Sequence, residues 1–147
     1  WVVAHKAAQN NDALGDITIA SRSIGKCEKI IESIKGKQNL KDSTKKLEAR
    51  AVNADDVDAL VALIEEVQPD LVINAGPPWV NVPIMEACDR AKVSYLDTSV
   101  AVDLCSEGQL VPEAYDPQWA FREKFKQAGI TGILGAGFDP GVVSVFA

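Results

Sequence analysis

The feature that most constrains the fold of this chain is a regular alternation of short apolar runs with amphipathic segments. Five segments read as strands. Four are apolar runs at residues 17–20, 70–74, 93–97 and 130–134, and in the fifth, residues 47–52, apolar side chains alternate with charged ones. Between the runs, apolar side chains recur at helical spacing, and after the first run this stripe consists of Cys27, Ile30, Ile31 and Ile34. Strands that alternate with amphipathic helices predict an α/β fold with a parallel, doubly wound sheet.

The flanking residues set the limits of the expected helices. Asn53 or Asp55 is the expected cap of a helix whose buried stripe consists of Val57, Leu60, Val61, Ile64 and Val67. A later stripe consists of Ile84, Met85, Cys88 and Ala91. One further helix is expected over residues 116–128, with Phe121, Phe125 and Ala128 as its buried stripe. The run at residues 70–74 has three consecutive apolar residues at its centre, which predicts a parallel strand buried on both faces.

Composition restricts the kind of partner. A chain of 147 residues with 47% hydrophobic content can build the core of one domain. Fifteen basic and twenty-one acidic residues give a net charge of −6, which argues against nucleic acid or an anionic membrane as the partner. We therefore expect a small-molecule ligand and a cytoplasmic location, since no apolar run approaches the length of a membrane span.

The cysteines and the single histidine indicate neither a disulfide framework nor a metal site. Cys27, Cys88 and Cys105 are odd in number and lie far apart in the sequence, so we expect free thiols. His5 has no second ligand at metal-binding spacing, and we expect a packing or surface histidine there.

The sequence after the first apolar run bears on nucleotide binding. In a dinucleotide-binding sheet of the Rossmann type, an acidic residue at the end of the second strand binds the 2′-hydroxyl of NAD, whereas an arginine there accommodates the 2′-phosphate of NADP. Here the strand leads into Ser21, Arg22 and Ser23. A guanidinium and hydroxyls can donate to phosphate, which favours NADPH. A surface arginine at a strand end fits this run equally well.

A Rossmann domain also needs a first strand and a Gly-rich turn that holds the pyrophosphate. Residues 1–11 read as a helix, with neither of these before it. We therefore expect that Trp1 is not the biological N-terminus. Residues 142–147 are apolar and carry no helix-stop signal, so we expect this end to be truncated as well.

Ligands of such sheets lie beyond the carboxyl ends of the strands, so each loop that follows a strand is a candidate site. In residues 74–78, Gly76 permits a close approach of the backbone, although a rigid turn before a helix is the alternative. Residues 97–99 offer a carboxylate and two hydroxyls for a ribose or a substrate, or for capping the next segment. Asp139 is a candidate contact, with a purely structural Asp-Pro turn as the alternative.

Four segments together resemble the saccharopine dehydrogenase family, and they are residues 20–23, 70–78, 95–99 and 135–141. The resemblance implies a Rossmann-like NADP-binding domain over residues 1–141 and the start of a catalytic, dimerising domain at residues 142–147. It implies that the cofactor-binding residues are Ser21, Arg22, Ser23, Asn53, Ala54, Asn74, Ala75, Gly76, Pro77, Pro78, Thr98, Ser99, Phe138, Asp139 and Pro140. The substrate-binding residues that it implies are Asp97, Thr98, Ser99 and Asp139.

Residues 21–28 and 115–125 are most similar to a branch of this family that forms carboxylated polyamines. This resemblance implies a homodimeric oxidoreductase that uses NADPH to condense aspartate β-semialdehyde reductively with a diamine, either 1,3-diaminopropane or putrescine. Saccharopine formation in lysine metabolism is the alternative reaction with the same fold and cofactor. A nucleotide-sensing or interaction module without catalysis is the alternative from a different class, because fold alone does not fix function.

Overall fold

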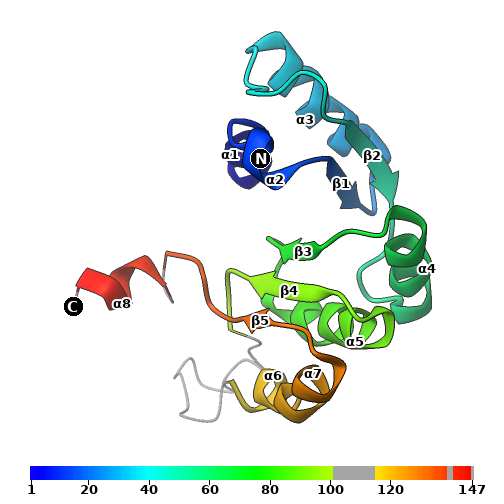
Figure 1. Ribbon diagram of the computed structural model, residues 1–147, viewed down its shortest axis with the longest axis vertical. Helices are drawn as coiled ribbons and strands as arrows, with labels where there is room; N and C mark the ends of the chain where they lie inside the picture. Colours follow the sequence, from blue (N-terminus) through cyan, green and yellow to red (C-terminus); the bar gives the residue numbers. More distant parts are fainter. Residues whose placement is uncertain (101–114, 139–140, 147) are drawn as a thin grey trace. The chain divides into compact units, whose positions relative to one another are not determined.

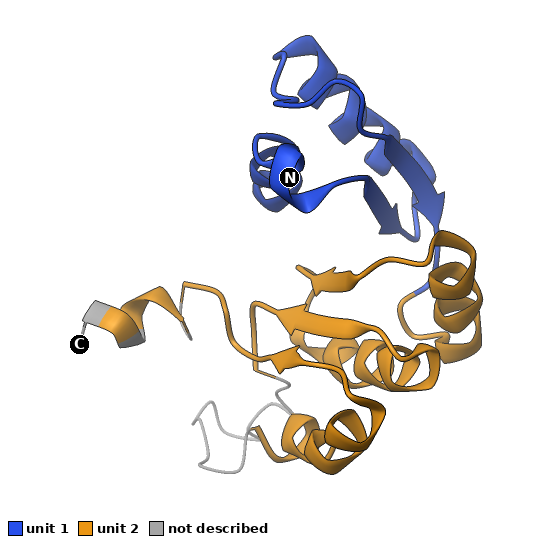
Figure 2. Cartoon of the chain, in the orientation of Figure 1, with its two compact units in different colours: residues 1–53 blue, residues 54–147 orange. Residues whose placement is uncertain are grey.

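The computed structural model describes residues 1–100, 115–138 and 141–146 of the chain. Cys105, Asp139 and Pro140 lie outside these residues. The chain divides into two compact units, residues 1–53 and residues 54–147 (Figure 2). Each unit has its own parallel sheet, which confirms the predicted parallel α/β class.

The first unit contains a two-stranded sheet (Figure 1). Strand β1 (Ile17–Ser21) pairs with β2 (Leu47–Ala51), and Ser21 lies opposite Ala51 at the carboxyl end. The helices of this unit are α1 (Val2–Ala8), α2 (Asn11–Leu14) and α3 (Ile24–Gly36). Because α3 connects the two parallel strands, it forms the crossover that such a pair requires.

The core of the first unit includes one face of α3. Cys27, Ile31 and Ile34 are buried, as the helical spacing predicts, and Ile30 is half-buried. Burial of each large aliphatic side chain contributes about 1.5–3 kcal/mol to folding. The predicted stripe therefore accounts for the packing of α3 on the sheet.

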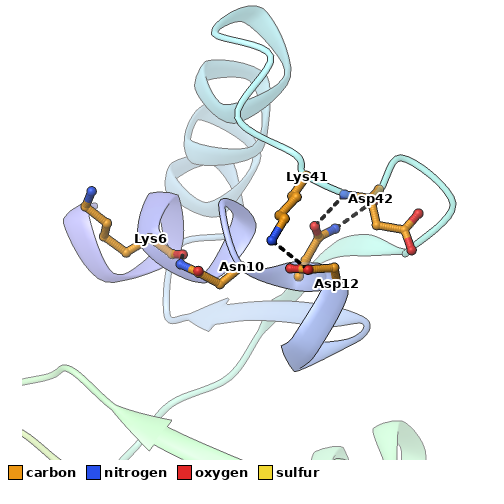
Figure 3. A network of polar contacts seen from close by, with 6 residues as sticks. Lys6, Asn10, Asp12, Lys41 and Asp42 are labelled. Carbon is orange, nitrogen blue, oxygen red and sulfur yellow. Dashed lines mark hydrogen bonds and ion pairs between the residues drawn. The ribbon is translucent and has the colours of Figure 1, made fainter.

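The lysine-rich loop after α3 is anchored to α2 by one buried amide (Figure 3). The fully buried Asn11 side chain donates from Nδ2 to the carbonyl oxygen of Asp42 at 2.8 Å and accepts at Oδ1 from the Asp42 N–H, also at 2.8 Å. Lys41 Nζ lies 2.7 Å from Asp12 Oδ2, but both side chains are exposed, and solvent screening leaves such pairs little effect on stability. The buried amide therefore matters more than the ion pair.

The second unit contains a three-stranded sheet in the order β3-β4-β5 (Figure 1). Its strands are β3 (Leu71–Asn74), β4 (Ser94–Asp97) and β5 (Gly132–Ile133). Its helical segments are α4 (Val57–Val67), η1 (Pro78–Val80), α5 (Asn81–Ala91), α6 (Asp116–Trp119), α7 (Arg122–Ala128) and α8 (Val142–Phe146). None of the helices formed by the described residues is long and apolar enough to cross a membrane.

Helix α5 packs against α4, β3 and β4. Its predicted stripe is confirmed at Ile84, Met85 and Cys88, which are buried, and Ala91 is half-buried. Cys27 in the first unit and Cys88 here are both free thiols, as expected. Burial raises the pKa of the Cys88 thiol to about 12, so the thiol remains protonated at neutral pH.

Helix α4 has a different cap from the predicted one. Asp56 caps this helix, because its carboxylate accepts a hydrogen bond from the Ala59 N–H at 3.0 Å. The prediction of Asn53 or Asp55 was therefore wrong. An N-cap side chain accepts from the amide two or three residues further on, and the extended backbone at Asp56 brings its carboxylate to the amide of Ala59.

The structure has two helices, α6 and α7, where a single helix was predicted over residues 116–128. The prediction of one continuous helix was therefore wrong. At the break, the Phe121 N–H donates to the Gln118 carbonyl oxygen at 3.1 Å, a three-residue step that tightens the turn. Both Gln118 and Phe121 are buried at this turn. The apolar stripe predicts the burial of Phe121 but gives no sign of the buried glutamine.

The faces of β3 also differ from the prediction. Leu71 and Ile73 are 38% and 40% exposed, whereas Asn74 is buried. A continuous apolar run does not specify whether both faces of a strand are covered by packed elements. The prediction of burial on both faces was therefore wrong for this strand.

Candidate functional site

In each unit, candidate residues lie at the carboxyl ends of the strands, where ligands of parallel α/β sheets bind. In the first unit this end is formed by residues 21–23 after β1 and residues 52–53 after β2. The Val52 N–H donates to the Ser21 carbonyl oxygen at 3.0 Å, so the two strand ends lie side by side. Asn53, which is exposed, follows directly.

Ser21 shapes the loop after β1. Its Oγ donates to the Ser23 carbonyl oxygen at 3.0 Å and accepts from the Ser23 N–H at 3.2 Å. The same oxygen lies 3.2 Å from Cys27 Sγ on α3. A hydroxyl has one proton, so when Ser21 donates it to the carbonyl, the Cys27 thiol is the donor to Ser21. The Ser21 hydroxyl is therefore engaged within the loop.

Arg22 and Ser23 present free donors at this strand end. Both residues are exposed, and Arg22 has no hydrogen bond or ion pair with any residue that the structure describes. Ser23 is the N-cap of α3, yet its hydroxyl caps no backbone amide. The N-terminus of this 13-residue helix carries partial positive charge. A guanidinium, a hydroxyl and helix amides form a donor set suited to phosphate.

In the second unit, the end of β3 is held by the buried side chain of Asn74. Its Oδ1 accepts from the Gly76 N–H at 2.9 Å, and its Nδ2 donates to Asn81 Oδ1 at 2.7 Å and to the Tyr95 hydroxyl at 3.2 Å. A Cβ at Gly76 would lie 3.0 Å from Asn74 Oδ1 and 3.2 Å from Val80 Cγ2. The loop after β3 is therefore tightly packed against Asn74 and has little room for a larger residue.

The end of β4 is held from two helices. Asn81 of α5, fully buried, donates from Nδ2 to the Ser99 carbonyl oxygen at 2.8 Å. Gln118 of α6 donates to the same oxygen at 3.4 Å, a longer contact. The Ser99 Oγ is buried and has no hydrogen-bond partner among the described residues, and Thr98 is half-buried.

Asp97 joins the end of β4 to the end of β5. Its carboxylate is fully buried, with Oδ1 2.7 Å from the Gly135 N–H and Oδ2 2.6 Å from Gln118 Nε2. Its backbone carbonyl oxygen accepts from the Ala136 N–H at 2.8 Å. Short bonds to both carboxylate oxygens give Asp97 a structural use that the sequence does not indicate.

Tyr95 is the neighbour of Asp97 in the core. Burial is the main cause that raises the pKa of Tyr95 well above its ordinary value. The hydrogen bond with the Asn74 amide lowers this pKa, and the negative charge of Asp97 raises it further. The phenol is therefore neutral over the physiological range. It serves as a hydrogen-bond partner of Asn74 within the core.

The remaining candidates differ in exposure. Ala75, Gly76, Pro77 and Phe138 are exposed, whereas Ala54 and Pro78 are half-buried. Phe138 is 76% exposed, so it is available for contact with a ligand or another segment. The candidates Asp139 and Pro140 lie outside the described residues.

Sequence reasoning missed Asn81, Tyr95 and Gln118 as parts of this site. Asn81 and Gln118 are polar positions within otherwise apolar helix faces, which is the only signal that the sequence carries. Their partners lie 7 to 21 residues away, so their use becomes clear only in the fold. His5, by contrast, is a packing residue as expected, buried with Nδ1 2.8 Å from Asn39 Nδ2.

Comparison with known proteins identifies similar chains. Residues 1–133 match the family described as saccharopine dehydrogenase NADP binding domain. Carboxynorspermidine synthase of Vibrio alginolyticus is 87% identical over all 147 residues, and carboxyaminopropylagmatine dehydrogenase of Synechocystis is 38% identical over 145 residues. The chain spans 36% of the length of the first relative and 33% of the second.

Among solved structures, saccharopine dehydrogenase (L-Glu forming) of Saccharomyces cerevisiae matches 98% of this chain with a TM-score of 0.68. The match covers 26% of that longer chain, at 19% sequence identity. At this identity the likeness concerns the fold alone. It confirms the Rossmann-like class that the alternating pattern and the strand-end residues predict.

Proposed function

This chain belongs to the saccharopine dehydrogenase NADP-binding domain family, and from this premise we propose that it binds NADPH through the loop that follows β1. The observation that carries the proposal is the exposed Arg22, without a partner among the described residues, beside the uncapped N-terminus of α3. An acidic residue at this strand end would select NAD, and here the acidic residue is absent.

In this proposal, Arg22 and Ser23 bind the 2′-phosphate directly. Arg22 donates through its guanidinium, and Ser23 donates through its hydroxyl beside the amides of α3. Ser21 contributes by shaping the loop, since its hydroxyl already bonds Ser23 and Cys27. Asn53 and Ala54 border the adenine.

Residues 74–78 lie along the dinucleotide in this proposal. The fit is supported by Gly76, where a side chain would crowd Asn74 and Val80 and would obstruct a backbone that approaches a ligand. In the same proposal, Thr98, Ser99 and Phe138 contact the nicotinamide end and the substrate. The resemblance assigns this role also to Asp139 and Pro140, which lie outside the described residues. The buried Ser99 hydroxyl supports this assignment, because it has no partner among the described residues.

For the protein as a whole we propose the reaction that the family resemblance implies, the reductive condensation of aspartate β-semialdehyde with 1,3-diaminopropane or putrescine in polyamine biosynthesis; the 87% identity to a carboxynorspermidine synthase supports it. When bound, NADPH supplies the hydride that reduces the imine formed by the two substrates. The residues of this chain bind and orient the cofactor. Asp97, whose two carboxylate oxygens are engaged by protein donors, acts by positioning the β4 end. A cytoplasmic location and a homodimer remain predictions.

The direct test follows the absorbance of NADPH in the intact protein with aspartate β-semialdehyde and each diamine. Oxidation of NADPH that requires both substrates supports the proposal, and its absence contradicts it. Activity instead with aminoadipate semialdehyde and glutamate would assign the protein to saccharopine formation. Tight binding of NADPH without turnover of either pair would favour the non-enzymatic alternative.

A further inference from the structure

A continuous path of hydrogen bonds, buried at its centre and partly buried at its ends, connects the loops after β3 and β4. The path leads from the Gly76 N–H to Asn74 Oδ1, from Asn74 Nδ2 to Asn81 Oδ1, and from Asn81 Nδ2 to the Ser99 carbonyl oxygen. These distances are 2.9, 2.7 and 2.8 Å. Each amide is used as both donor and acceptor, so the path defines one orientation for each side chain.

Gln118 extends this path to the loop after β5. Its Nε2 lies 3.4 Å from the Ser99 carbonyl oxygen and 2.6 Å from Asp97 Oδ2, and Asp97 Oδ1 accepts from the Gly135 N–H at 2.7 Å. Gln118 is 1% exposed and belongs to α6, outside every loop that follows a strand. Gln118 therefore contacts Asp97 and Ser99 from helix α6 and not from within one of these loops.

A purely stabilising role does not require such an arrangement. Buried polar groups in place of apolar ones add little net stability, because their desolvation offsets the bonds that they form. A fully satisfied network does restrict the core to one arrangement. Three loops joined through directed bonds keep a fixed relative geometry at this edge of the sheet.

On the basis of the proposed function, we propose that Gln118 is a positioning residue for the nicotinamide end of NADPH. It touches neither the cofactor nor the substrate. It holds Asp97 and the Ser99 carbonyl, and through them the backbone of residues 97–99 and 135–136 that faces the nicotinamide. Catalytic support of this kind depends on holding loops within a fraction of an ångström.

The informative variant is Gln118→Met in the intact protein. Methionine keeps most of the length and volume of glutamine but cannot donate to Asp97 or Ser99. The matched control is Val93→Ala, which removes buried apolar atoms just before β4, at the amino end of the strand, and leaves the network intact. Both variants lower the melting temperature, so stability alone does not distinguish them.

Three readouts separate positioning from stability: the Kd for NADPH, the fluorescence of bound NADPH, and kcat with the proposed substrates. For Gln118→Met we expect a Kd within about threefold of the wild type, altered nicotinamide emission and a kcat lower by about tenfold or more. Val93→Ala leaves all three unchanged. If Gln118→Met has the nicotinamide emission and the kcat of the wild type, the positioning role of Gln118 is overturned and the proposed function still stands. A wild-type protein that binds no NADPH would overturn the proposed function and the inference together.

Discussion

The two units of this chain use polar side chains in opposite ways at their strand ends. In the first unit, Arg22 and Ser23 are exposed, and the Arg22 guanidinium has no partner among the described residues. In the second unit, three buried polar side chains bond protein groups: Asn74 bonds Asn81, Asn81 bonds the Ser99 carbonyl, and Asp97 bonds the Gly135 N–H. The first unit offers donors to a ligand, whereas the second uses its donors to hold its own backbone.

This difference indicates a division of tasks within the proposed NADPH site. Exposed donors contribute binding energy only when a charged group arrives, so they determine affinity and the choice between NADPH and NADH. Buried networks contribute geometry, so they determine how the reactive end of the cofactor is oriented. Four changes test this comparison, from the largest expected effect to the smallest.

The largest effect is expected for Asp97→Ala in the second unit. The change leaves the buried Gly135 N–H and the Gln118 amide without their acceptor, and each such loss costs about 1–3 kcal/mol. We expect the free energy of unfolding to fall by about 3–5 kcal/mol, measured by urea denaturation. The control Asp58→Ala removes an exposed acid 2.8 Å from Arg90 and costs less than about 1 kcal/mol. Equal losses in the two variants would refute the structural use of Asp97.

In the first unit, Arg22→Ala removes the charged donor and leaves the fold intact. The loss of a charge-assisted bond to phosphate weakens NADPH binding by about 30-fold, and NADH binding changes less than about twofold. Calorimetric titration of both nucleotides measures the ratio. Lys29→Ala, an exposed cation on the same helix α3, serves as the control and leaves the ratio unchanged. If NADPH and NADH lose affinity equally, Arg22 does not read the phosphate.

Alkaline pH should destabilise the second unit through Cys88. Its thiol has an ordinary pKa of 9.0, and burial raises this pKa to about 12 in the fold. Because the folded pKa is the higher one, this contribution to stability is complete below pH 9 and is lost as the pH rises toward 12. Between pH 8 and 10 we expect a loss of about 1.4 kcal/mol, measured by denaturation. Cys88→Ala should remove most of this slope, because the raised pKa of Tyr95 contributes the remainder near pH 10. An unchanged slope would exclude Cys88 as its main cause.

The smallest effect is expected at the cap of α4. Asp56→Ala removes the acceptor of the Ala59 N–H and lowers the free energy of unfolding by about 1 kcal/mol, whereas Asp56→Asn keeps the cap and changes it by a few tenths. Neither variant alters the choice between NADPH and NADH, because the cap takes no part in phosphate recognition. A change in that choice would contradict the separation of tasks.

The sequence predicts the elements of this fold better than their ends. The stripe of Cys27, Ile31 and Ile34 and the strands around it follow from local periodicity, and the structure confirms them. The cap of α4 and the break between α6 and α7 depend on which side chain meets which amide, and several candidates stand close together in the sequence. Periodicity cannot choose among them.

The candidate residues of the two units also differ in how far they can be predicted. Arg22 is recognisable because its proposed role depends on a local position at the end of a strand. Gln118 is not recognisable, because a polar residue on a helix is ordinarily exposed, and its partner Asp97 lies 21 residues earlier. The proposed ligand contacts are therefore open to sequence reasoning, whereas the residues that support them require the fold.

Titration of 2′,5′-ADP, the adenine half of NADP, against the intact wild-type protein and the variants Arg22→Ala and Gln118→Met tests whether the two units divide these tasks. We expect Arg22→Ala to lose affinity for this fragment by about 30-fold, as it does for NADPH. We expect Gln118→Met to bind the fragment as the wild type does, because the fragment lacks the nicotinamide end. Loss of affinity for the fragment in Gln118→Met, or none in Arg22→Ala, would contradict the division of tasks between the two units.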